Sequence, residues 1–162
     1  MRILIVEDEF IVADDLRLTL EQAGYEICGI AASVEEAREQ VKLQHPSLVL
    51  LDIHLKGSLN GITLARELKE QNIGFVYLSA NSNRSILEAA KSTEPYGFLV
   101  KPFREKDLLV AIDIAFYHHQ HGMDARWKRE MQLQRSLAVI QQLDGPWEKK
   151  MFEMAREIES VV

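Results

Sequence analysis

Four short apolar segments of the chain each end in polar side chains that could take part in chemistry. Short apolar runs between polar residues are typical of buried strands, and an open α/β sheet binds its ligands outside the carboxyl ends of its strands. We therefore expect these side chains to meet in one small pocket. In chain order they are Glu7 and Asp8 after residues 3–6, Asp52 after residues 48–51, Ser79 after residues 75–78, and Lys101 after residues 98–100.

A pocket that holds three carboxylates needs positive charge. Two carboxylates about 5 Å apart repel each other by roughly 3 kcal/mol at an effective dielectric constant near 20. A hard divalent cation offsets this repulsion, and Mg²⁺ fits best because it binds one or two carboxylates and keeps several waters. Lys101 supplies a second, fixed positive charge. Such a pocket is suited to stabilise a phosphoryl group while a carboxylate attacks it, which predicts an aspartyl phosphate on Asp52.

Each of these signals has a simpler interpretation when it is taken alone. An acidic run such as residues 7–9 is usually a solvated loop, and a single Asp after a strand usually caps a helix or lies in a turn. A Lys-Pro pair usually marks a turn. The joint occurrence of the signals, each at the end of a separate segment, favours the pocket.

Composition indicates an ordinary globular protein. The chain has 162 residues, of which 47% are hydrophobic and 27% charged, and no apolar stretch approaches the roughly 20 residues of a membrane span. The first apolar run begins directly after Arg2, which leaves no room for a signal peptide, so we expect a cytoplasmic protein. The lone Cys28 excludes an internal disulfide framework. The net charge of -6 disfavours a nucleic-acid partner, because nucleic-acid-binding domains usually carry a basic face.

Strand-like and helix-like segments alternate from residue 2 to about residue 120, as in βαβ units around a parallel sheet. This alternation predicts an α/β fold. Gly24 is suited to end the first helix, and Ser33 and Glu36 form a capping box that opens the second. The expected strands are residues 3–6, 25–30, 48–51, 75–78 and 98–100, and the expected helices are residues 11–23, 33–44, 62–70, 82 or 85 to 91, and 105–119.

Beyond Gly122 the pattern changes, and no further strand is expected. Residues 123–143 are a polar helix candidate, residues 144–146 break it, and residues 147–160 form a helix with one apolar face. We interpret residues 1–120 as one domain and residues 121–162 as a helical extension. The extension either lengthens the fifth helix and pairs with a second copy, or links to a further domain. Without a basic recognition helix, it is not expected to bind DNA.

Taken together, the chain up to about residue 120 resembles the receiver domains of two-component response regulators, a CheY-like superfamily. The resemblance implies a doubly wound sheet of five parallel strands, in the order 2-1-3-4-5, between flanking helices. It also implies that phosphate comes from a sensor histidine kinase or a phosphotransfer protein, and that the protein is not an enzyme with a separate substrate. The implied site consists of the phosphoacceptor Asp52, Lys101 and Ser79, and a Mg²⁺ ion held by Glu7, Asp8, Asp52 and the backbone carbonyl of His54.

The resemblance implies a two-state switch as well. When Asp52 carries phosphate, the hydroxyl of Ser79 moves to bond it, and an aromatic ring three positions before Lys101 turns inward. That ring is Phe98, and the fourth helix, fifth strand and fifth helix would form the face that partners read. From their positions, His54 and Asn81 are candidates for setting the lifetime of the phosphate.

Residues 55–61 depart from the resemblance, because they lack the Met-Pro that many receivers carry there. Three other classes of protein also use this kind of sheet. A haloacid-dehalogenase-like phosphatase would carry a second Asp where His54 stands, and a flavodoxin-like protein would need a phosphate-binding loop where the acidic residues 7–9 stand. A binding module that is never phosphorylated would usually lack Asp52 or Lys101, and both are present.

Overall fold

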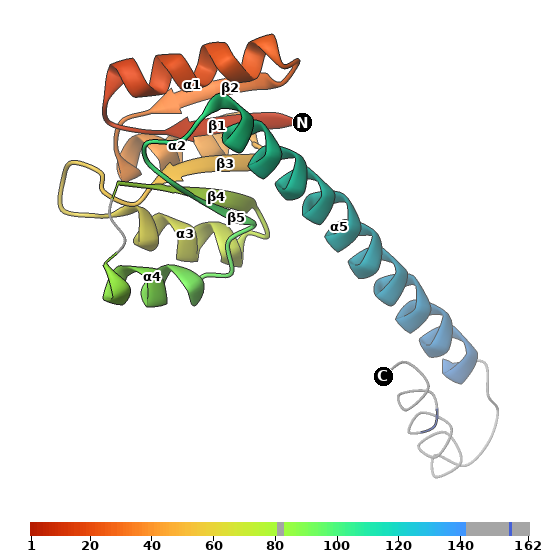
Figure 1. Cartoon of the computed structure of the whole chain (residues 1–162). Helices are drawn as coiled ribbons and strands as arrows, with labels where there is room; N and C mark the ends of the chain where they lie inside the picture. Colours follow the sequence, from red (N-terminus) through yellow and green to blue (C-terminus); the bar gives the residue numbers. More distant parts are fainter. Residues whose placement is uncertain (81–82, 142–155, 157–162) are drawn as a thin grey trace. The chain divides into compact units, whose positions relative to one another are not determined.

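The computed structural model describes residues 1–80, 83–141 and 156 of the chain. It divides into two compact units, Met1–His119 and Gln120–Val162. The first unit contains a sheet of five parallel strands in the order β2-β1-β3-β4-β5 (Figure 1). The predicted fold class and strand order are therefore confirmed.

Apart from the end of α5, the strands and helices of the first unit begin and end within about two residues of their predicted limits. The strands are β1 (Arg2–Val6), β2 (Glu26–Ala31), β3 (Leu48–Asp52), β4 (Gly74–Ser79) and β5 (Gly97–Val100). The helices are α1 (Phe10–Gln22), α2 (Val34–Gln44), α3 (Gly61–Glu70), α4 (Arg84–Lys91) and α5 (Glu105–Gln141).

Helix α5 continues without a break through Gly122 to Gln141, as expected if the extension lengthens the fifth helix. The limit of residue 119 given for the fifth helix itself is therefore too early. A glycine inside a helix costs about 1 kcal/mol relative to alanine, which is too little to end a helix between good helix formers. The predicted break at residues 144–146 lies outside the described residues, and so do Asn81, Ser82 and the predicted helix of residues 147–160, apart from Arg156, which is helical.

Two apolar cores form, one on each face of the sheet. One core contains buried side chains of α2, α3 and α4, and the other contains buried side chains of α1 and α5. Successive strand residues alternate between them, as the pleat requires: Leu4 lies in the first core, and Ile3 and Ile5 lie in the second. Strand β3 is buried along its whole length, which explains its unbroken apolar sequence.

A side-chain oxygen caps α2 as the sequence predicts, and a different residue from the predicted ones caps α4. Ser33 accepts a hydrogen bond from the backbone N–H of Glu36 at 3.2 Å and opens α2. At α4 the cap is Asn83, which accepts hydrogen bonds from both the backbone N–H and the hydroxyl of Ser85 at 3.0 Å. Of the two serines that could open this helix from sequence, Ser82 lies outside the described residues, and Ser85 is not the cap because the Asn83 side chain already satisfies this turn.

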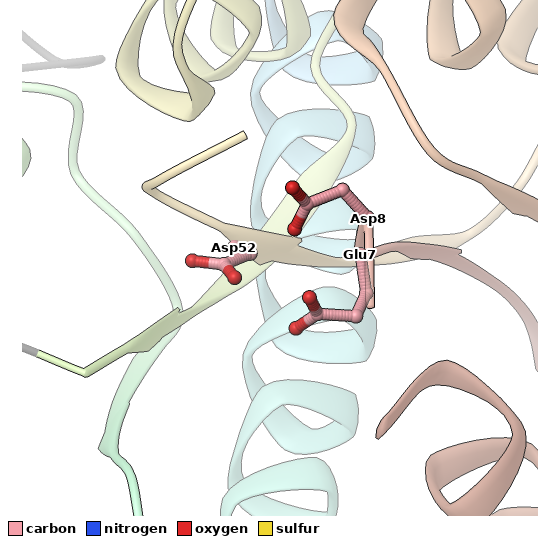
Figure 2. A group of neighbouring side chains, drawn as sticks. All are labelled: Glu7, Asp8 and Asp52. Carbon is pink, nitrogen blue, oxygen red and sulfur yellow. The ribbon is translucent and has the colours of Figure 1, made fainter. Parts of the chain in front are cut away.

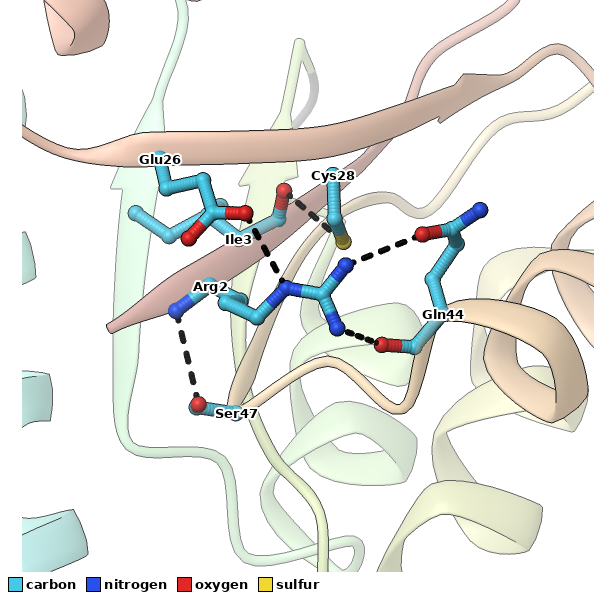
Figure 3. A network of polar contacts seen from close by, with 6 residues as sticks. All are labelled: Arg2, Ile3, Glu26, Cys28, Gln44 and Ser47. Atoms are coloured by element: carbon cyan, nitrogen blue, oxygen red, sulfur yellow. Dashed lines mark hydrogen bonds and ion pairs between the residues drawn. The ribbon is translucent and has the colours of Figure 1, made fainter.

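Arg2 ties the amino-terminal end of β1 to its neighbours (Figure 3). Its guanidinium donates hydrogen bonds to Glu26 on β2 at 3.2 Å and to the side chain and backbone carbonyl of Gln44 at the end of α2, the side-chain bond measuring 2.9 Å. Nearby, the thiol of Cys28 donates to the carbonyl of Ile3 at 3.4 Å, and burial raises the pKa of this thiol. The strand that ends in Glu7 is thus anchored at its other end.

None of the helices, within the part of the chain that the structure describes, has the length and apolar character needed to cross a membrane.

Helix α3 begins against the end of β3, and the contact is close enough to require glycine. The N–H of Gly61 donates to the carbonyl of Ile53 at 2.9 Å. A Cβ at Gly61 would lie 2.2 Å from the carbonyl oxygen of Asp52 and 2.9 Å from the Cα of Ile53. Both contacts are to backbone, which cannot move aside without shifting Asp52.

We expect Gly61→Ala to lower the free energy of unfolding by about 1 to 3 kcal/mol, the usual cost of overpacking. Urea unfolding followed by circular dichroism measures this change. Gly122→Ala is the matched control, because a Cβ there would meet nothing within 4 Å. It should not lower the urea concentration at which half of the protein is unfolded. If Gly61→Ala unfolds at the same urea concentration as the unchanged protein, the close contact is contradicted.

Candidate functional site

The register of the sheet aligns the carboxyl ends of four strands. Asp52, the last residue of β3, pairs with Leu78 of β4, and Ser79 pairs with Val100 of β5. Glu7 directly follows β1. The polar residues at the strand ends therefore lie along one edge of the sheet, as the sequence predicts.

The three acidic side chains that the sequence selects do meet. Ligand oxygens of Glu7, Asp8 and Asp52 all lie within 4.8 Å of one another (Figure 2). In Figure 2 the carboxylates of Glu7 and Asp8 project from the end of β1 on the side of Asp52. Glu7 and Asp52 are buried, with 1% and 4% of their surface exposed, whereas Asp8 is half-buried.

Lys101 joins the two buried carboxylates. Its ammonium donates hydrogen bonds to Glu7 Oε2 at 2.7 Å and to Asp52 Oδ2 at 3.0 Å. The second oxygen of each carboxylate accepts from a backbone N–H: Glu7 Oε1 from Glu9 at 3.0 Å, and Asp52 Oδ1 from His54 at 2.9 Å. Both carboxylates are therefore held in fixed orientations by one cation and two amides.

Burial and neighbouring charges shift the pKa values of Glu7 and Lys101. Burial raises the pKa of Glu7 to about 7, although the hydrogen bonds from Lys101 and Glu9 act in the opposite direction. Burial alone would lower the pKa of the Lys101 ammonium, but its hydrogen bonds to Glu7 and Asp52 outweigh this effect and raise it. Lys101 is therefore a permanent cation within the site.

The donor set fits a hard divalent cation. It offers three carboxylates against one ammonium, so an excess of negative charge remains, and oxygen ligands are those that Mg²⁺ prefers. Among the residues that the structure describes, no hydrogen-bond or ion-pair partner is seen for the carboxylate of Asp8, which is partly open to solvent. Glu7, Asp8 and Asp52 are thus the residues that would hold the ion.

His54 contributes in a way that its residue type does not reveal. Its side chain is exposed, and its backbone N–H holds the phosphoacceptor candidate Asp52. Sequence reasoning missed this role, because any residue type supplies the same amide; the position two residues after Asp52 was its only signal. The role of the His54 carbonyl as a metal ligand stays a prediction.

Ser79 and Phe98, the two residues of the expected switch, lie on the neighbouring strands β4 and β5. Ser79 is fully buried as the last residue of β4, and its carbonyl accepts a hydrogen bond from the N–H of Lys101 at 2.7 Å. Phe98 is half-buried, and its ring centroid lies 5.9 Å from that of Tyr77. Their movement in response to phosphate stays a prediction.

The loop that lacks Met-Pro still connects β3 to α3 in an ordered way. Leu55 is buried and Leu59 packs against the same apolar core. Gly57 takes a φ of 118°, a conformation that other residues rarely adopt. Asn60 then caps α3 by accepting from the N–H of Thr63 at 3.1 Å.

We expect Asp8→Asn to stabilise the protein without Mg²⁺ and to abolish stabilisation by Mg²⁺, because one of three clustered carboxylates is removed. Relief of about 1 kcal/mol of repulsion would raise the melting temperature by roughly 4 °C in a domain of this size. Thermal unfolding with and without the ion measures both effects.

Glu9→Gln makes the same change in charge one residue away, on an exposed side chain, and should keep the Mg²⁺-dependent rise. An Asp8→Asn variant that Mg²⁺ still stabilises as strongly as the unchanged protein would exclude Asp8 as a ligand.

Comparisons with known proteins agree with this geometry. Residues 3–113 match the response regulator receiver domain family. The transcriptional regulatory protein PdtaR of Mycobacterium tuberculosis is 39% identical over 115 residues, which cover 70% of this chain and 56% of PdtaR. The aerobic respiration control protein ArcA of Escherichia coli K12 is 34% identical over 111 residues, which cover 67% of this chain and 45% of ArcA. The chain thus spans about half the length of these relatives.

Solved structures show the same fold. The signal receiver domain of a modulated diguanylate cyclase from Desulfovibrio desulfuricans G20 aligns with a TM-score of 0.70 at 30% identity, over 75% of this chain and 97% of that domain. The N-terminal domain of a response regulator/sensory box/GGDEF 3-domain protein from Carboxydothermus hydrogenoformans aligns with a TM-score of 0.69 at 28% identity, over 76% and 99%. The chain belongs to the response regulator receiver domain family, and residues 3–113 are its receiver domain.

Proposed function

We propose that this receiver takes a phosphoryl group onto Asp52 from the phosphohistidine of a sensor histidine kinase or a phosphotransfer protein. One observation carries the proposal: the Lys101 ammonium bonds Asp52 and Glu7 at once, at the edge of the sheet where three carboxylates converge. A carboxylate held beside a permanent cation can attack phosphorus while the cation pairs with the phosphoryl oxygens.

The transfer exchanges one bond for another. An oxygen of Asp52 bonds to phosphorus, the bond from phosphorus to the histidine nitrogen breaks, and the nitrogen keeps the electron pair. The N–H of His54 holds Asp52 Oδ1, and Lys101 lies within hydrogen-bond distance of Oδ2. When bound by Glu7, Asp8 and Asp52, Mg²⁺ would offset the charge of the carboxylates and of the phosphoryl oxygens.

Hydrolysis of the aspartyl phosphate by water completes the cycle and restores the carboxylate of Asp52. The chain then acts stoichiometrically, and it is not an enzyme that turns over a separate substrate. The exposed side chain of His54 lies beside the site, and we propose that it tunes the rate of this hydrolysis. While phosphate is present, Ser79 and Phe98 would move and change the surface that partners bind.

We expect the protein to gain the mass of one phosphate during incubation with acetyl phosphate and Mg²⁺, and to gain none without the ion. Intact-protein mass spectrometry measures this directly. Asp52→Asn should gain nothing, whereas Asp15→Asn, the same change on the exposed side of α1, should behave like the unchanged protein. Absence of phosphate on the unchanged protein, both with acetyl phosphate and with a phosphorylated histidine phosphotransfer protein as donor, would contradict the proposal and favour a binding module that works without phosphorylation.

We further propose that a second copy of the chain covers the exposed apolar side chains of α5. Trp127 and Met131 are 67% and 36% exposed, and their spacing of four residues places them on one helix face. Large aromatic side chains are the commonest anchors of protein interfaces. Pairing would remove this surface from water, and phosphorylation would alter how tightly the copies bind.

We expect sedimentation velocity to show a dimer whose dissociation constant rises at least about tenfold in Trp127→Lys, the usual cost of losing a central aromatic anchor. Leu18→Lys, at a 44% exposed position on α1, is the control and should leave the dissociation constant unchanged. A monomer at all concentrations, with and without phosphate on Asp52, would contradict the pairing.

A further inference from the structure

Tyr77 is a neighbour of both residues of the proposed switch, Ser79 and Phe98. It precedes Ser79 by two positions on β4, so both side chains belong to the same face of the sheet. Across the strand pair, Tyr77 is the direct neighbour of Phe98 in the register, with ring centroids 5.9 Å apart and ring planes inclined by 58°. Tyr77 is completely buried, and its ring packs against the ring of Phe98.

The hydroxyl of Tyr77 is fastened to the segment that follows α4. It lies 2.7 Å from the hydroxyl of Thr93, which is itself 1% exposed. The Thr93 hydroxyl donates its own hydrogen to the carbonyl of Ala90 at 2.5 Å, so Tyr77 must be the donor in the first bond. A directed chain of two hydrogen bonds thus runs from Tyr77 to the last turn of α4.

Helix α4 has few other buried contacts. Ala90 is the buried residue among its eight, whereas the ten residues of α3 include five buried ones. An element with little buried apolar surface opens locally at a low free energy, so one buried hydrogen bond has a large share in holding it. The bond from Tyr77 to Thr93 is therefore well placed to control the position of α4.

We propose that Tyr77 is a positioning residue that couples the position of α4 to the ring of Phe98, through its hydrogen bond to Thr93 at one end and its ring contact at the other. This inference rests on the proposed function, because the coupling matters only if Phe98 reports phosphate on Asp52. The simpler alternative is that Tyr77 and Thr93 only fill the core and contribute to global stability.

A double-mutant cycle without phosphate separates these alternatives. The readout is the NMR resonance of the Phe98 ring, assigned by its loss in Phe98→Leu. Thr93→Val removes the acceptor and should shift this resonance, whereas Thr93→Ser keeps a hydroxyl and should leave it near its original position. In a Tyr77→Phe background, Thr93→Val should produce no further shift, because no hydroxyl remains at residue 77 to transmit it.

Tyr25→Phe is the matched control. Tyr25 also donates a hydrogen bond, to Asp113 on α5 at 2.6 Å, and it packs in the core on the opposite face of the sheet from Tyr77. Its loss should leave the Phe98 resonance in place. The proposal would be overturned if Thr93→Val does not shift the Phe98 resonance. It would also be overturned if Thr93→Val shifts this resonance equally in the Tyr77→Phe background.

Hydrogen exchange supplies the second readout. Loss of one buried hydrogen bond should speed amide exchange in the last turn of α4 about threefold to tenfold in both Tyr77→Phe and Thr93→Val. Amides of α3 should keep their rates. Equal acceleration in α3 and α4 would show that the pair contributes only to global stability, and would also overturn the proposal.

Phosphorylation distinguishes failure of this inference from failure of the proposed function. All variants should take up phosphate on Asp52 as the unchanged protein does, by intact mass, while the shift that phosphate causes at Phe98 should fall by at least about half in Tyr77→Phe. If the unchanged protein takes up no phosphate, the proposed function fails, and the phosphate-free cycle still decides the coupling. Normal uptake with an undiminished Phe98 shift would overturn the coupling alone.

Discussion

The ammonium of Lys101 connects the ends of three strands, because it follows β5 and bonds Glu7 after β1 and Asp52 at the end of β3. Without this cation, carboxylates less than 5 Å apart would repel by roughly 3 kcal/mol at an intermediate dielectric constant. The parallel register, the buried core beneath and the anchoring of β1 by Arg2 all keep these three groups aligned. The same cation that makes the site compatible with folding is thus the one available to a phosphoryl group.

Close packing restricts the backbone around the acidic residues at the carboxyl ends of the strands. Gly61 brings the start of α3 against the backbone of Asp52, so the position of the phosphoacceptor candidate depends on a helix terminus as well as on its own strand. On the same face of the sheet, Tyr77 of β4 is linked to the end of α4 through Thr93. Helix α3 has five buried residues, whereas α4 has one, with Ile86 and Ala89 partly buried against the same core. Helix α4 is therefore held by less buried surface than α3.

Much of this arrangement could be predicted from sequence, because it depends on side-chain type and spacing. Buried strands are apolar and end in polar residues, which located Asp52 and Lys101 and gave the strand order through a family resemblance. Backbone groups carry no such signal, so the amide of His54 as a partner of Asp52 was missed. The continuity of α5 through Gly122 was one of two alternatives left open by the sequence, since one glycine is a weak breaker whose effect depends on its neighbours.

The two oxygens of Asp52 are not interchangeable. Oδ1 accepts from a backbone N–H, which is part of the chain and cannot leave, whereas Oδ2 accepts from the flexible side chain of Lys101. In the proposed phosphorylation, an arriving phosphoryl group would compete with Oδ2 for the ammonium and would leave the hydrogen bond to Oδ1 in place. Oδ2 would then become the bridging oxygen of the acyl phosphate, and Oδ1 would become its carbonyl, already polarised by the amide of His54.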